Sequence, residues 1–314
     1  MPSLFVTING KLSDPVRLDR YVSENLKILS RSQIKTRNLK AKVNGKDVKF
    51  SKLVFNGDSL ELKWDESPLI DLIPENIPLD IIYEDKNCVV VNKAQGMVVH
   101  PGAGNRHGTL ANALYYRRLN IIKQEQCFSL PVSVRPGIVH RLDKDTSGII
   151  IAAYNDETHS FLAQQFKSRV TRKNYAAVIH GSPKEKEGRI ETNISRDTKN
   201  RKKFTVAANG KTAVTCYKVI KSWNKYSLVL LRPKTGRTHQ LRVHLRYIGH
   251  PILGDILYAD NYGGSQILNA SLMLHSKSLA ITIPGEIEKR LFTSDLPQRF
   301  FTIIEKLNRM NING

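Results

Sequence analysis

Blocks of apolar and polar residues divide the chain into short elements. The clearest case is PGIVHRLDKDTSGIIIAAY, residues 136–154, in which a charged run lies between apolar segments at 138–139 and 149–153. This pattern predicts a strand, a tight loop and a second strand, with the polar residues from His140 to Ser147 on the loop and Gly148 at its end. Two rigid strands would hold the side chains of such a loop in fixed positions.

The first part of the chain predicts two short helices. Asp14 and Pro15 suit an N-cap and a first helical residue, and apolar residues follow them at helical spacing. Ser30 and Gln33 have the spacing of a capping box, which predicts that a second helix begins at Ser30. The polar side of that second helix carries basic residues, among them Arg31 and Lys35. Charge on one face of a helix is commonly a solvated surface.

A small sheet and a linker should follow the two helices. The pairs Asn44-Gly45 and Asn56-Gly57 predict tight turns between short strands. The composition then changes in WDESPLIDLIPENIP, which contains three prolines and four acidic residues where the flanking segments are basic. We therefore expect an N-terminal domain at residues 1–65, a linker at 66–78 and a second domain at 79–314.

The second domain alternates short strand-like runs with a few helical segments. Thr238 can cap a helix that Gly249 ends, which puts Arg237 at a strand-to-helix corner. The other predicted elements are a buried strand at 88–91, helices at 109–116, 155–166 and 297–308, and strands at 228–231 and within SLMLHSKSLAITIP. The mixture predicts an α+β fold.

The charge of the chain points to a polyanionic partner. The 314 residues include 49 Lys and Arg against 28 Asp and Glu, a net charge of +21 at pH 7, and their 40% hydrophobic content suffices for a core. Such an excess suits nucleic acid or an anionic membrane face. Residues 167–246 hold 21 of the basic residues and four acidic ones. The densest run, SRDTKNRKK, contains Arg201, Lys202 and Lys203 and predicts an exposed loop along an RNA backbone.

Other compositional features exclude several classes of protein. Cys88, Cys127 and Cys216 are odd in number and far apart, so they suggest neither a disulfide framework nor a zinc site. His239 and His244 are a poor metal pair at a spacing of five. No run reaches the roughly 18 apolar residues of a membrane span, and the N-terminus lacks a basic region followed by an apolar core. We expect a cytosolic protein with no membrane partner.

Three interpretations of the 140–148 loop each explain only some of its residues. A solvated turn would explain the Asp, Ser, Thr and Gly residues. A calcium loop would need a bidentate Glu where Tyr154 stands. An aspartyl-phosphate enzyme would use Asp143 and Asp145 with Mg²⁺, but His140 interrupts the hydrophobic strand that it needs.

The whole string HRLDKDTSG, residues 140–148, resembles the signature of the pseudouridine synthases that act on ribosomal RNA. In that family the Asp of the RLD triplet is the catalytic carboxylate, which here is Asp143. The resemblance implies that Arg141 fills the space left by a flipped base, and that His140 and Thr146 contact the RNA.

Further motifs extend this resemblance along the chain. TGRTHQLRVH resembles the motif whose first Arg, here Arg237, pairs with the catalytic carboxylate and orients it. RKNYAAVIHG places Tyr175 at the family's active-site Tyr, although a core Tyr would fit the pattern equally. Leu274 matches an apolar position beside the target base. VNKAQGMVVHPGAGN resembles the opening of the catalytic domain, and its HPGAGN portion points to the branch that modifies the large ribosomal subunit.

The resemblance also implies the fold and the partners. The family has an α+β catalytic domain with a mixed, largely antiparallel sheet and an RNA-binding cleft. Residues 1–65 resemble the small RNA-binding domain first seen in ribosomal small-subunit protein four, which docks RNA without catalysis. This resemblance implies that Arg31 and Lys35 contact RNA. Isomerisation of uridine involves neither redox chemistry nor group transfer between molecules, so we expect no cofactor and no metal. We expect the protein to be a monomer. Its expected partner is large-subunit ribosomal RNA, free or within an assembling particle.

Other functions remain open at this point. The same chemistry could act on another ribosomal RNA site or on a transfer RNA. A non-catalytic RNA-binding or ribosome-assembly protein would explain the charge but would leave HRLDKDTSG unexplained. A phosphotransferase built on Asp143 and Asp145 would need Mg²⁺, and metal independence would exclude it.

Overall fold

The computed structural model describes residues 2–10, 12–26, 28–29, 34, 37–65, 72–102, 104–124, 137–259, 262 and 269–312. The chain divides into two compact units, Met1–Asp71 and Leu72–Gly314. Each unit has its own hydrophobic core, so each is described by itself. No helix within these described ranges is long and apolar enough to cross a membrane.

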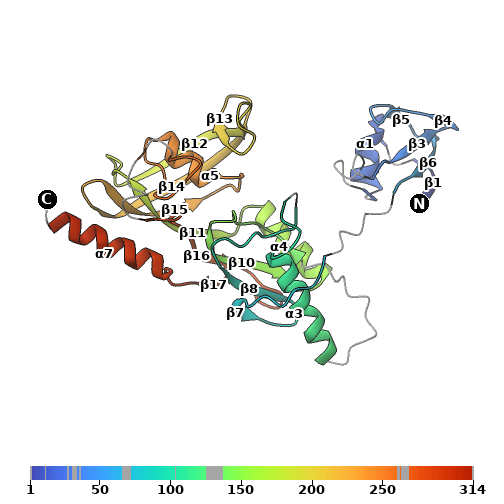
Figure 1. The fold of residues 1–314 in the computed structure, drawn as a ribbon. Helices are drawn as coiled ribbons and strands as arrows, with labels where there is room; N and C mark the ends of the chain where they lie inside the picture. Colours follow the sequence, from blue (N-terminus) through green and yellow to red (C-terminus); the bar gives the residue numbers. More distant parts are fainter. Residues whose placement is uncertain are drawn as a thin grey trace. The chain divides into compact units, whose positions relative to one another are not determined.

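The first unit is a small α+β structure (Figure 1). Its antiparallel sheet has the order β1-β6-β3-β4, and a second short pair joins β2 to β5. A helical segment follows β2, as α1 with one π-helical stretch, η1. The elements are β1 Ser3–Thr7, β2 Val16–Arg17, α1 Leu18–Arg20, η1 Tyr21–Asn25, β3 Lys40–Val43, β4 Lys46–Asp47, β5 Leu53–Val54 and β6 Ser59–Lys63.

The structure tests the predicted turn at Asn44-Gly45 and the predicted start of the first helix. The Asn44-Gly45 turn is confirmed, since the φ angles of 53° and 76° are those that a tight β3–β4 hairpin requires. The first helix begins at Leu18 and not at Pro15, because Val16 and Arg17 are instead paired with β5. Arg31 and Lys35 lie outside the described residues, so their contact with RNA stays a prediction.

The second unit is built on one 11-stranded sheet with the order β13-β12-β14-β15-β11-β16-β10-β8-β7, to which β17 and β9 add at β16 and β10. Of the strand pairs in the described part of this unit, β10 with β16 alone is parallel. The mixed, largely antiparallel sheet confirms the predicted fold class. The strands are β7 Asp80–Glu84, β8 Cys88–Lys93, β9 Gly137–Ile138, β10 Ser147–Ala153, β11 Arg172–His180, β12 Glu187–Arg196, β13 Phe204–Val206, β14 Lys211–Ser222, β15 Tyr226–Pro233, β16 Leu274–Ile281 and β17 Arg290–Thr293.

The helices of this unit are α3 Leu110–Gln124, α4 Asp156–Lys167, α5 Gln240–Tyr247 and α7 Gln298–Ile312. Figure 1 shows α3 and α4 beside the β7, β8 and β10 part of the sheet, and α5 beside β12 and β14. Asn155 caps α4 by accepting a hydrogen bond from the backbone N–H of Thr158 at 2.8 Å. The N-cap of α5 is His239, one residue later than the predicted Thr238.

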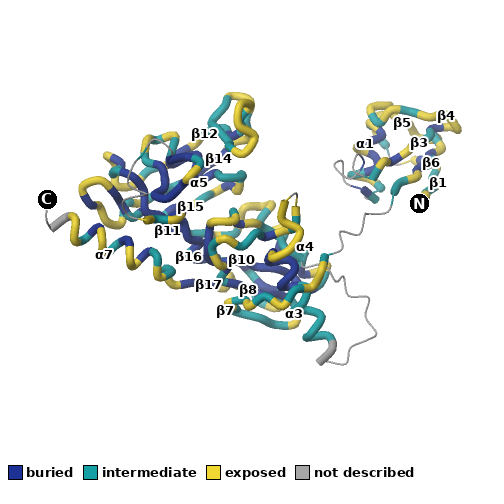
Figure 2. Tube along the Cα trace, in the orientation of Figure 1, coloured by how far each residue is buried: buried dark blue, intermediate teal, exposed yellow. Residues whose placement is uncertain are grey.

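The central strands are buried on both faces. Along β10, Ile150 and Ala152 join one hydrophobic cluster, whereas Ile149, Ile151 and Ala153 join another. Successive side chains of a strand point to opposite faces, so both faces of β10 must be covered. The continuous run of buried residues through the middle of the sheet is visible in Figure 2. This rigid centre carries the loop that precedes β10.

Candidate active site

A cavity of about 480 Å³ lies where the loop before β10 meets the start of β11, the β15–α5 corner and the start of β16. Asp143 is the one acidic side chain among the described residues that line it. Seven lining side chains are basic: Arg141, Lys167, Arg169, Lys173, Lys234, Arg237 and Arg242. A single carboxylate in a strongly cationic cavity suits a polyanionic substrate.

Asp143 lies in this cavity with a cation and an imidazole beside it. Its Oδ2 is 3.7 Å from Nη1 of Arg242 and 4.0 Å from Nε2 of His239. About 20% of the side chain is exposed, so a substrate can still reach the carboxylate. The geometry therefore presents one accessible carboxylate next to a fixed positive charge.

Arg242 is held in place from its other side by Asp255. Its Nε and Nη2 atoms donate to the two oxygens of the fully buried Asp255 carboxylate, both at 2.7 Å. The guanidinium also lies over the ring of Tyr258, 5.0 Å from its centroid. A bidentate pair fixes the plane of an arginine. Nη1 is thus directed at Asp143 before any substrate binds.

The predicted pairing of Arg237 with Asp143 is not the one that the structure contains. Nε of Arg237 donates to the backbone oxygen of Thr212 at 3.1 Å, although the side chain lines the same cavity. The arginine beside Asp143 is Arg242, from the same motif. Because α5 begins at Gln240, its third residue is the one that points to the carboxylate.

Gln240 explains why the β15–α5 corner is rigid. Its Oε1 accepts from the hydroxyl of Thr235 at 2.7 Å and from the backbone N–H of Arg237 at 3.0 Å. Its Nε2 donates to the backbone oxygen of Val214 and the hydroxyl of Thr215. This buried amide ties the corner to β14, so the helix that carries Arg242 starts at a fixed place.

His239 faces Asp143 in one tautomer. Its Nδ1 is 2.9 Å from the hydroxyl oxygen of Tyr258, which accepts a hydrogen bond from the backbone N–H of Phe204. Within the described residues Tyr258 has no other acceptor for its proton, so it donates to Nδ1 and leaves the proton of His239 on Nε2. Burial lowers the pKa of His239, which favours this neutral form. The Nε2–H group can donate towards Asp143 or a bound substrate.

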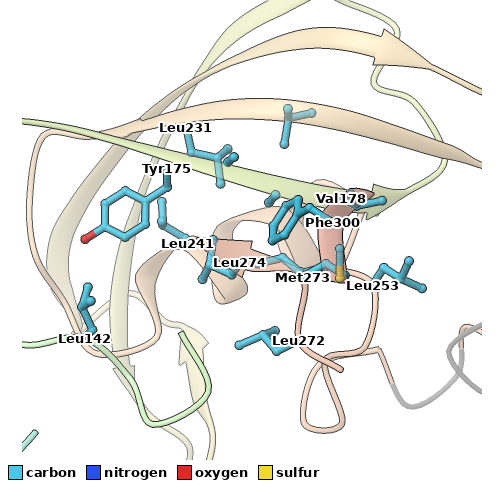
Figure 3. Close-up of a cluster of buried hydrophobic side chains, with 14 of the residues drawn as sticks. Leu142, Tyr175, Val178, Leu231, Leu241, Leu253, Leu272, Met273, Leu274 and Phe300 are labelled. Atoms are coloured by element: carbon cyan, nitrogen blue, oxygen red, sulfur yellow. The ribbon is translucent and has the colours of Figure 1, made fainter. Parts of the chain in front are cut away.

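Part of the cavity lining is apolar and surrounds Tyr175. Figure 3 shows its ring among Leu142, Leu241 and Leu274, with the hydroxyl directed away from Phe300. Burial, with a further contribution from the charge of Asp143, raises the pKa of Tyr175 to about 12. The phenol is therefore neutral near pH 7. Tyr175 and Leu274 can flank a planar base beside the carboxylate.

Lys93, a residue that the sequence analysis did not single out, supports the loop of Asp143 from behind. Its buried Nζ donates to the backbone oxygens of Ala94 and Met97, both at 2.8 Å, and to that of Lys144 at 3.1 Å. Burial lowers the pKa of Lys93 to about 8. Lys93 lies within the motif VNKAQG, which could have indicated a role in the site. Its contact with Lys144 is seen only in the three-dimensional structure.

The other loop residues divide into buried and exposed ones. The ring of His140 stacks on Phe166 with centroids 4.5 Å apart, and its Nε2 accepts from the backbone N–H of Ile151. Burial lowers its pKa to about 3, so it is a neutral residue that holds the loop. The buried hydroxyl of Thr146 has no hydrogen-bond partner in the described part of the chain. Arg141 is exposed on the wall of the cavity.

The predicted basic loop is an exposed connection between β12 and β13. Arg201 and Lys202 are exposed and Lys203 is partly buried. His244, in contrast, packs inside: its Nδ1 and Nε2 lie 2.9 and 3.1 Å from the hydroxyls of Thr215 and Thr192. No group of three or more His, Cys, Asp or Glu that could hold a metal occurs in the ranges that the structure describes.

Known proteins are similar to this chain in sequence and in fold. A family model described as RNA pseudouridylate synthase matches residues 87–247. In an alignment of 294 positions that covers 91% of this chain and 87% of the other, the chain is 47% identical to a Borreliella burgdorferi protein named ribosomal large subunit pseudouridine synthase D. It is 36% identical to an uncharacterized RNA pseudouridine synthase of Bacillus subtilis, covering 93% of this chain and 94% of that one. The structure of human RNA pseudouridylate synthase domain containing 4 matches with a TM-score of 0.56 and 26% identity, covering 73% and 93% of the two chains. This chain belongs to the family of RNA pseudouridine synthases.

Proposed function

We propose that this enzyme isomerises a specific uridine of large-subunit ribosomal RNA to pseudouridine, with Asp143 as the catalytic carboxylate. The observation that carries the proposal is the position of Asp143: it is the one acidic side chain among the described residues of a cationic cavity, 3.7 Å from the fixed guanidinium of Arg242. An ionised carboxylate in that place can attack, or remove a proton from, the sugar or base of a bound uridine.

The surrounding residues have roles that follow from their chemistry. A base within folded RNA must be flipped to reach the cavity, at a cost of roughly a few kcal/mol. Arg141, exposed on the cavity wall, can take the vacated place by stacking and by bonding to phosphate. Tyr175 and Leu274 flank the base. Tyr175 lines the cavity and stacks near the base or assists removal of the proton from carbon 5.

The RNA target rests on the relatives and on charge. Proteins of Borreliella burgdorferi and Blochmanniella floridana, 47% and 38% identical to this chain, are named for the large ribosomal subunit. The basic loop with Arg201, Lys202 and Lys203 would follow the RNA backbone, and residues 1–65 would dock a second part of the RNA. The enzyme acts as a monomer, either on free RNA or on an assembling particle.

Tritium release tests both the chemistry and the target. Large-subunit RNA, naked or in assembled particles, would be prepared from cells that lack the protein, with uridine tritiated at carbon 5. Wild-type enzyme in EDTA should release tritium from one mapped position, whereas Asp143→Asn should release none and still bind the RNA within about 3-fold, since one isosteric amide replaces a carboxylate.

Each negative result has its own meaning. Turnover by Asp143→Asn would remove Asp143 from the mechanism. If large-subunit RNA gives no release, tritiated transfer RNA from the same cells would be the next substrate, and release from it would replace the target and keep the chemistry. Binding without release from any RNA would favour the non-catalytic RNA-binding protein, and release that EDTA abolishes would contradict a metal-free reaction.

A further inference from the structure

A second cavity, of about 240 Å³, opens between β13 and α5. Its floor is apolar because Val243 and Tyr258 belong to a small hydrophobic cluster between α5 and the β12–β14 part of the sheet. Its wall carries aromatic rings and two basic side chains. The rings are those of Phe204, Tyr247 and Tyr258, and the basic side chains are Lys203 and Arg246.

We propose that this second cavity binds an unpaired base of the substrate RNA close to the target uridine, with Tyr247 as its stacking platform. The inference rests on the proposed function, since it assigns a second contact to the same RNA. It identifies the ligand by class, a nucleobase attached to a phosphate backbone, and leaves the identity of the base open.

The distance between the two cavities supports the proposal. Tyr258 lies between them: its ring lines the second cavity, and its hydroxyl is 2.9 Å from Nδ1 of His239, which lines the first. The ring of Phe204, also in the second cavity, packs edge-on against His239 with centroids 5.6 Å apart. Only one layer of side chains separates the sites, so a strand with its uridine at Asp143 passes close to the second cavity.

The chemistry of the rim matches a nucleotide. Tyr247 is 61% exposed at the end of α5 and lines the cavity, so much of its aromatic ring is open to a ligand. Proteins bind single-stranded RNA by stacking bases on such rings and by placing cations along the backbone. Arg246 supplies one cation, and its guanidinium lies over the ring of Tyr262, 5.2 Å from the centroid.

The basic loop is continuous with this cavity. Asp197 and Lys203, at the two ends of the loop between β12 and β13, both line it. The loop also exposes Lys199, Arg201 and Lys202. Phosphates that follow the loop would bring the attached base to the mouth of the cavity, so charge complementarity favours RNA over a neutral or basic partner.

Binding measurements with Tyr247→Ala would test the proposal. The RNA is the fragment on which wild-type enzyme releases tritium, and affinity is measured in an Asp143→Asn background that prevents turnover. Loss of one stacked base, about 1–3 kcal/mol, should raise Kd about 5- to 150-fold. Tyr247→Phe should stay within about 3-fold of the parent, because it retains the ring. Phe301→Ala, which removes an aromatic side chain of α7 that is 46% exposed, is the matched control and should leave Kd unchanged.

A second readout separates binding from catalysis. With Asp143 present and RNA saturating, the single-turnover rate of Tyr247→Ala should equal that of the wild type, and 2-aminopurine placed next to the target uridine should lose its quenching in the variant. An unchanged Kd, or a loss of saturated rate without a change in Kd, would overturn the proposal. If wild-type enzyme releases no tritium, the fragment is chosen by binding alone. A Kd effect would then support the cavity while the proposed reaction fails.

Discussion

At the level of single residues, the site depends on which arginine reaches Asp143. Arg237 and Arg242 belong to one motif and line one cavity, but only Arg242 is clamped by a buried carboxylate, that of Asp255. A guanidinium held on one side by Asp255 cannot reorient freely, so its charge at Asp143 is fixed in advance. Replacement of Arg242 should therefore affect the reaction rate, whereas replacement of Arg237 should affect RNA binding.

Lysine substitutions at these two positions should separate orientation from binding. Arg242→Lys keeps the charge but loses the bidentate pair with Asp255, so the single-turnover rate at saturating RNA should fall about 100-fold. Arg237→Lys should change that rate by less than about 3-fold and act mainly on Kd. Circular dichroism would confirm that both variants fold. The opposite order of rates would restore Arg237 as the partner of Asp143.

At the level of elements, the active-site loop depends on the parallel contact between β10 and β16. Ser147 and Gly148 pair with His275 and Ser276 of a strand more than 120 residues away along the chain. A Cβ atom on Gly148 would lie 2.2 Å from the backbone oxygen of Ser276, and its φ is +111°. The loop can end here only because position 148 has no side chain.

Two glycine substitutions distinguish this close approach from backbone strain. Gly148→Ala should lower the free energy of unfolding by about 3 kcal/mol or more, since the clash is with backbone. Gly96→Ala has a similar positive φ, +86°, but meets no atom within 4 Å, so strain alone should cost about 1–2 kcal/mol. Urea denaturation measures both values. Equal losses would show that β16 moves aside at no cost.

The sequence predicts elements where a local pattern decides them. The apolar runs of β8, β10 and β15 and the helix expected at 155–166, which is α4, are of this kind. The start of α5 is not, because His239 takes a left-handed φ of 56°, a conformation that is uncommon for residues other than glycine. Non-local pairing likewise decides whether Val16 and Arg17 form a strand. The motif therefore indicates which residues form the site, and tertiary structure decides which arginine faces Asp143.

At the level of the whole molecule, folding buries several imidazoles in neutral form. Burial lowers the pKa of His140 to about 3 and those of His244 and His275 to about 4, from the ordinary 6.5. Between pH 6.5 and about 4 these three groups are protonated in the unfolded chain and neutral in the folded one. The unfolded state then binds more protons, so stability must fall as the pH falls through this range.

The expected slope is steep enough to measure. Three extra protons correspond to about 4 kcal/mol of unfolding free energy per pH unit, whereas from pH 7 to 8 these histidines contribute nothing. His244→Gln should reduce the slope by about a third, because a glutamine can still meet the hydroxyls of Thr192 and Thr215 and does not titrate. Urea midpoints from pH 7.5 to 4.5 would measure this. If the free energy of unfolding did not change between pH 6.5 and 5, the buried imidazoles would be taking up protons in the folded state. The neutral form assigned to His140 would then be wrong.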